Sequence, residues 1–187
     1  MRRKVISCVI CALMIATVFM IEIPCNVKAQ VIEEWVAIYD GPRTGHDYAR
    51  AIAVDSEGNI YVTGRSSAIY GTGFDYVTIK YDSDGNQLWI ARYDGFNFDD
   101  RPSSIALDLK GNVYVTGFSY SPDTDEDYTT VKYDSSGNEL WVARYDGPGD
   151  GWDWPQDIAL DTSANVYVTG YSGGVGTRRD YATIKYD

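Results

Sequence analysis

Short runs of β-branched, aromatic and small apolar residues alternate along this chain with clusters of Asp, Gly, Asn and Ser. In the run 60–63, Ile60 and Val62 face one way and Tyr61 faces the other, so both faces are apolar. A solvated antiparallel sheet would alternate apolar with polar residues. The pattern therefore predicts short strands that are buried on both faces.

Four such strands and two tight turns make one unit. The turns share a chemistry: Asp55 opens the first, where its carboxylate can bond backbone amides two residues on, and Gly58 supplies the positive φ. The third copy of this turn has Ala164 in place of the glycine, which costs about 1 kcal/mol if the backbone is kept. The predicted strands of the first complete unit are 51–55, 60–63, 76–81 and 88–93.

The unit repeats every 53 residues, as Tyr61, Tyr114 and Tyr167 show. A period of this length predicts an array or a β-propeller. Sheets that are apolar on both faces fit the radial stacking of propeller blades. The predicted fold class is all-β, with four-stranded antiparallel sheets as blades in three repeats. The last blade is expected to be split, with its fourth strand supplied by the N-terminal run 34–41.

Three recurring motifs resemble the beta-propeller repeat family called SBBP. They are N-[IV]-Y-V-T-G from Asn59, D-Y-x-T-[IV]-K-Y-D from Asp75 and L-W-[IV]-A-R-Y-D-G from Leu88, each with later copies. The resemblance covers nearly all of the chain after its leader. It implies four-stranded blades in exported bacterial proteins, and it implies no catalytic residues.

Three blades are fewer than the four to eight of closed propellers. Open ends would expose apolar faces, and arrays need capped or joined ends. Two interpretations follow. Two chains could pair head to tail as a homodimer that completes a six-bladed ring. Alternatively, the chain is a fragment of a longer propeller.

The first 29 residues are interpreted as a secretory signal peptide. Arg2, Arg3 and Lys4 precede an apolar stretch, and residues 27–29 form a small-residue cleavage site. Retention as an anchor and lipidation at Cys25 are the two alternatives. Cleavage would leave residues 30–187 as the repeat domain with no membrane span, in a secreted, periplasmic or cell-surface protein.

Composition narrows the chemistry. All three cysteines lie within the leader, so the mature chain has no disulfide and no thiolate metal site. Without the leader, 12 basic residues face 26 acidic ones. Such a surface repels phosphate backbones, which argues against a nucleic-acid partner. A protein or carbohydrate ligand is easier to accommodate.

Function is expected on the face that carries the longer, variable loops. Asp47, Asp100 and Asp153 stand at equivalent positions there and could bind a cation such as calcium. The alternative is that each aspartate bonds backbone amides of its own loop. No other cofactor is expected.

Trp152 and Trp154 break the repeat, because His46 and Tyr48 occupy the equivalent positions in the first loop. Exposed indoles can stack on a sugar or anchor a protein, so Trp152, Trp154 and His46 are the candidate ligand-binding residues. The run 170–174 matches G-x-S-x-G, but no helix is predicted after it. We therefore expect a secreted, non-enzymatic binding or scaffold module. The alternative is a calcium-assisted enzyme, lactonase-like or hydrolase-like, on the same loop face.

Overall fold

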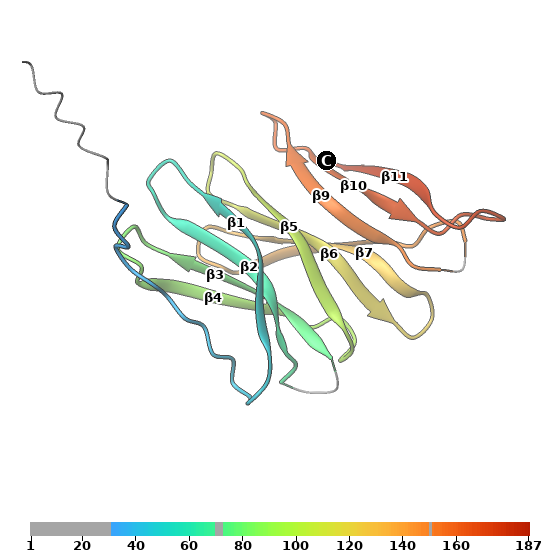
Figure 1. Cartoon of the computed structure of the whole chain (residues 1–187). Helices are drawn as coiled ribbons and strands as arrows, with labels where there is room; N and C mark the ends of the chain where they lie inside the picture. The colour runs from blue at the N-terminus through green and yellow to red at the C-terminus, as the bar shows by residue number, and fades with distance from the viewer. Residues whose placement is uncertain (1–30, 70–72, 150) are drawn as a thin grey trace, which may run out of the picture. The chain divides into compact units, whose positions relative to one another are not determined.

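The computed structural model describes residues 31–69, 73–149 and 151–187, and residues 34–187 form one compact unit. The described residues contain eleven strands in three antiparallel sheets and no helix (Figure 1). The first sheet has the order β1-β2-β3-β4, the second β5-β6-β7-β8, and the third β11-β10-β9. The strands are β1 (Asp47–Val54), β2 (Ile60–Ser67), β3 (Phe74–Tyr81), β4 (Gln87–Tyr93), β5 (Asp100–Leu107), β6 (Val113–Ser121), β7 (Asp125–Tyr133), β8 (Glu139–Tyr145), β9 (Trp154–Leu160), β10 (Val166–Ser172) and β11 (Asp180–Tyr186).

The tight turns have the predicted chemistry. Asp55 Oδ1 accepts from the backbone N–H groups of Glu57 and Asn59, and the Asn59 side-chain amide donates to Asp55 Oδ2. Gly58 has φ = 83°, as the turn requires. Ala164 adopts the same left-handed backbone, with φ = 64°. The third copy has therefore kept the turn despite the strain that a Cβ introduces there.

Burial on both faces is clearest in the middle sheet. Along β6, every residue except Tyr120 is buried, and β7 is buried from Asp127 to Val131. Neighbouring sheets cover both faces: Val131 shares a core cluster with Tyr76 of the first sheet, and Tyr128 shares one with Ile158 of the third. The predicted stacking of blade-like sheets is confirmed here.

The N-terminal run 34–41 does not complete the third sheet, which keeps three strands. Residues 31–46 form no strand, and this run lies against the first sheet instead. Trp35 Nε1–H donates to Ser83 O at 3.1 Å, and Gly41 N–H donates to Asp47 Oδ2 at 3.0 Å. These two contacts hold the run next to β1–β4, so the expected split blade is not formed within one chain.

The predicted leader, residues 1–29, lies outside the described residues. Within the described residues, no helix has the length and the hydropathy that a membrane crossing would require.

Candidate functional site

The first strand of each sheet carries a β-bulge near its start. The extra residues are Arg50, Ser103 and Gln156, because pairing with the second strand skips each of them. The bulges lie on β1, β5 and β9, and β5 contacts both of the other two. Bulges commonly re-aim side chains next to functional sites. Here all three line one hollow of about 330 Å³.

Aromatic side chains and arginines line this hollow. Its lining includes Tyr48, Arg65, Arg101, Phe118 and Trp154. The Arg65 guanidinium lies 4.6 Å from the ring centre of Tyr48, and that of Arg101 lies 5.6 Å from the ring centre of Phe118. These are cation–π distances. Both arginines also face Phe74, at 4.7 Å and 5.8 Å, so it links them into one row.

The predicted ligand residues lie at the two ends of this row. Trp154 stacks on Phe118, with ring centres 5.0 Å apart, and Trp152 stacks on Trp154 at 6.0 Å. Trp152 is 51% exposed. At the other end, His46 lies 5.9 Å from Tyr48. We call the whole series the aromatic–arginine row; its members are His46, Tyr48, Arg65, Phe74, Arg101, Phe118, Trp154 and Trp152.

The row is fixed by polar contacts on one side. Trp154 Nε1–H donates to Glu126 Oε2 at 2.5 Å, and Arg101 pairs with Asp99 at 2.5 Å. Burial raises the pKa of Glu126, although the Trp154 bond and the charge of Arg101 act in the other direction. The Nε atoms of Arg65 and Arg101 are buried and find no acceptor among the described residues. Their donor capacity is therefore not used up by the protein that the structure describes.

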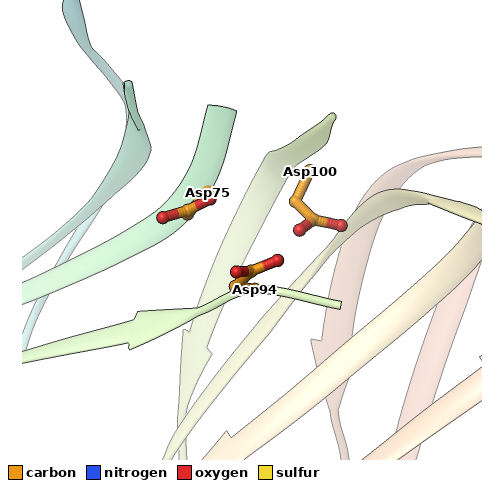
Figure 2. Close-up of side chains that lie close together, drawn as sticks. All are labelled: Asp75, Asp94 and Asp100. Atoms are coloured by element: carbon orange, nitrogen blue, oxygen red, sulfur yellow. The ribbon is translucent and has the colours of Figure 1, made fainter. Parts of the chain in front are cut away.

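The three predicted metal residues do not gather into one ring. Asp100 lies instead with Asp75 and Asp94, with carboxylate oxygens within 4.8 Å of one another (Figure 2). Asp75 comes from β3 and Asp94 follows β4, so this group joins the first sheet to the start of β5. Burial raises the pKa of Asp100 to about 7, against the Ser119 hydroxyl and the Gly95 amide, and the charges of Asp94 and Asp75 add to the increase.

A second group repeats the arrangement one period later, with Asp153 beside Asp127 and Asp146. Each predicted aspartate also bonds its own loop: Asp47 accepts from Gly41 N–H, Asp100 from Gly95 N–H and Asp153 from Gly147 N–H. Asp75 and Asp127 are paired with Arg92 and Arg144. Loop capping thus accounts for contacts of all three, and cation binding stays a prediction.

A family model for the beta-propeller repeat, SBBP, matches residues 41–71, 90–122 and 141–176. The chain belongs to this family. The three matches begin at residues 41, 90 and 141, and each spans the start of a sheet, including its bulge and the loop before it. The matches contain β1 and β2, β5 and β6, and β9 and β10 in full.

Other similar proteins share low sequence identity with this chain. An uncharacterized WD repeat-containing protein of Acanthamoeba polyphaga mimivirus is 28% identical over 156 residues, covering 64% of this chain and 11% of that protein. Two solved structures are similar, at 14% and 15% identity and each over 73% of this chain. They are a fucose lectin from Kordia zhangzhouensis with methyl-fucoside (TM-score 0.46, 94% of that chain) and a protein of unknown function from Bacteroides caccae (TM-score 0.44, 42% of that chain).

Sequence reasoning missed most of the row. Tyr48, Arg65, Phe74, Arg101 and Phe118 were not singled out, although a signal was present. Three SBBP repeat positions change residue type between copies, although each has at least one neighbour that is the same in all three copies. These positions hold Tyr48, Arg101 and Trp154; Arg65, Phe118 and Tyr171; and Phe74, Glu126 and Arg179.

Proposed function

We propose that this chain is a secreted, non-enzymatic binding module that takes a short acidic glycan in the hollow beside the aromatic–arginine row. One observation carries the proposal: Arg50, Arg65 and Arg101 line the same hollow in a protein whose net charge is −11. A local cluster of cations on an acidic protein indicates an anionic ligand.

The chemistry of the lining favours a sugar acid. Guanidinium groups bind carboxylates through paired, charge-assisted hydrogen bonds. Trp152 stacks on Trp154 and is 51% exposed, so its indole suits the apolar face of a sugar ring. The surrounding acidic surface would repel a long polyanion, so a ligand of a few sugar units fits best.

Tryptophan fluorescence titration tests this proposal. We expect tri-galacturonate or sialyllactose to change the emission of Trp152 and Trp154, and neutral cellotriose to leave it unchanged. Arg101→Gln should weaken binding roughly tenfold through loss of one charge-assisted pair. Binding should also weaken as salt rises, because the attraction is screened.

Lys110→Gln is the matched control. It removes one positive charge from the tight turn between β5 and β6, and it should leave the affinity unchanged. A Glu-rich peptide tests the competing protein ligand. If the peptide binds through Arg101 and the sugar acids do not, the ligand is an acidic protein segment and the glycan is wrong. No response to either class would contradict the binding site.

The same titration separates the enzyme alternative. A calcium-assisted site would place the ion at Asp75, Asp94 and Asp100, the group that joins the first and second sheets. That function requires glycan binding and thermal stability to respond to calcium and to EDTA. We expect neither to change, because Arg92 already pairs with Asp75 and the Gly95 amide with Asp100.

A further inference from the structure

Neighbouring sheets are joined by a tyrosine that inserts over a glycine. Tyr76 on β3 is fully buried, and its hydroxyl donates to the carbonyls of Phe118 at 3.2 Å and Thr129 at 3.4 Å in the second sheet. It lies so close to Gly117 that a Cβ there would come within 2.5 Å of its oxygen. Tyr128 on β7 is equally buried, and a Cβ at Gly170 would come within 2.6 Å of its oxygen.

The two end sheets each hold half of this joint. Tyr181 on β11 occupies the position of Tyr76 and Tyr128, yet it is 98% exposed. At the other end, Gly64 on β2 occupies the position of Gly117 and Gly170, and it lines an open apolar hollow of about 590 Å³. Within the described residues, Tyr181 thus has no glycine to pack over, and Gly64 has no tyrosine packed over it.

The wall of the hollow confirms that this face resembles the buried ones. Ile52 is 66% exposed, whereas its equivalents Ile105 and Ile158 are 9% and 7% exposed. The first sheet covers Ile105, which shares a core cluster with Tyr76. The second sheet covers Ile158, which shares a core cluster with Tyr128. Val54 is exposed in the same way, while its equivalent Leu107 is packed against that cluster. The exposed face of the first sheet therefore matches the surface that the second sheet presents to the first at their junction.

Strand pairing within the described residues is also incomplete at both ends. The run 34–41 lies where the fourth strand of a preceding sheet would lie: Trp35 Nε1–H donates to Ser83 O at 3.1 Å, as Trp89 Nε1–H donates to Ser135 O at 3.0 Å. Trp35 packs over Gly85 as Trp89 packs over Gly137. However, no described strand pairs with this run, and β11 has no fourth strand beside it.

We propose that a second copy of this chain closes both ends, so that Tyr181 of each copy enters the hollow over Gly64 of the other. The run 34–41 of one copy then becomes the fourth strand beside β11 of its partner. The junctions within the chain set the register. Thr78 pairs with Ala91 and Ile79 with Ile90, so Thr183 should pair with the partner subunit's Ala37 and Ile184 with the partner subunit's Val36. Two chains of three sheets, related by a two-fold axis, give six blades.

One residue departs from the pattern and provides a test. Ile38 stands where Arg92 and Arg144 stand in β4 and β8. Arg92 binds Asp75 and Ser66, and Arg144 binds Asp127 and Ser119. The equivalent acceptors on the third sheet are Asp180 and Ser172. Ile38→Arg should supply the missing guanidinium and tighten the pairing.

Sedimentation equilibrium over a range of protein concentrations tests the proposal. We expect a dimer, with no larger species. Tyr181→Ala should shift the equilibrium to monomer because it removes the side chain that enters the hollow. Ile52→Glu should do so because it places a charge in the hollow. An equimolar mixture of the two variants retains one intact contact out of two, so it should dimerise with intermediate affinity. Ile38→Arg should lower the dissociation constant at least roughly tenfold, as expected for a buried charge-assisted pair.

Leu109→Ala is the matched control, because Leu109 is equally exposed but lies on a tight turn. It should leave the dimer unchanged. Circular dichroism of each variant shows whether the monomer is folded. We expect both single variants to fold, because Tyr181 and Ile52 are exposed. A folded monomer at every concentration would overturn the proposal. So would a dimer that survives both variants, or an open polymer in place of a closed pair.

Discussion

The two ends of the same strands treat acidic residues in opposite ways. At the end with the tight turns, hydrogen bonds lower the pKa of Asp82 and Asp134, chiefly those from the side chains of Asn86 and Asn138. At the end with the variable loops, burial raises the pKa of Asp75 and Asp100. We call these the turn end and the loop end.

The difference reflects how complete each local network is. The carboxylate of Asp108 accepts from two backbone amides, the Asn112 side chain and the Tyr114 hydroxyl. Burial alone would raise its pKa, but these bonds outweigh burial and lower it. Asp100 is almost fully buried, and it accepts a backbone hydrogen bond from the Gly95 amide. The turn end thus stabilises its charges locally, whereas the loop end keeps carboxylates in an environment that disfavours them, a feature common at functional sites.

Removing a turn-end carboxylate should have the largest effect. Asp108→Ala leaves several donors without an acceptor, including the hydroxyl of the buried Tyr114. We expect the free energy of unfolding to fall by about 2–3 kcal/mol, measured by urea denaturation. Asp123→Ala, which removes an exposed carboxylate at the loop end, should change it by no more than about 0.5 kcal/mol. Equal effects of the two variants would show that the turn network is not what stabilises the sheets.

The turn end is also the part that the sequence predicts best. Asp55, Gly58 and Asn59 lie within five residues, so a local pattern contains all of the groups that interact. The strands follow for the same reason, since their apolar character and period are local. Burial on both faces then predicts stacked sheets, and the middle sheet confirms it.

The loop end could be predicted only in part. Phe74, Arg101 and Trp154 come from three different sheets, and their proximity depends on how the sheets stack. The bulges at Arg50, Ser103 and Gln156 leave no local signature that marks an extra residue. The structured first strands also begin earlier than predicted, so that Asp47, Asp100 and Trp154 lie in strands and not in loops. The grouping of Asp100 with Asp75 and Asp94 follows from this geometry.

The pKa of Asp100 predicts a pH dependence of the opposite sign to that of the turn end. Its folded value of about 7 lies above the ordinary 3.8, so its contribution is fully present below 3.8 and is lost as the pH rises to about 7. We expect stability to fall by about 1–2 kcal/mol between pH 5 and pH 8 at fixed ionic strength. Asp100→Asn, which stays neutral, should flatten this slope.

The turn-end aspartates provide the internal comparison for that experiment. Their lowered pKa values mean that their contribution is present above 3.8 and is lost only as the pH falls through the folded values. The two effects therefore fall in separate pH windows. A slope between pH 5 and pH 8 that is the same in Asp100→Asn would show that another group is responsible.

The smallest expected effect concerns the one imperfect turn. Ala164 has φ = 64°, whereas the other tight turns have glycine at this position. Ala164→Gly should raise the free energy of unfolding by about 1 kcal/mol, because glycine adopts this backbone without strain. Ser163→Gly in the same turn is the control, since Ser163 has no positive φ and glycine there adds entropy to the unfolded chain. The two changes should have opposite signs in thermal melts. If both destabilise, Ala164 contributes a contact that outweighs its backbone strain, and the turn end is less uniform than its hydrogen bonds indicate.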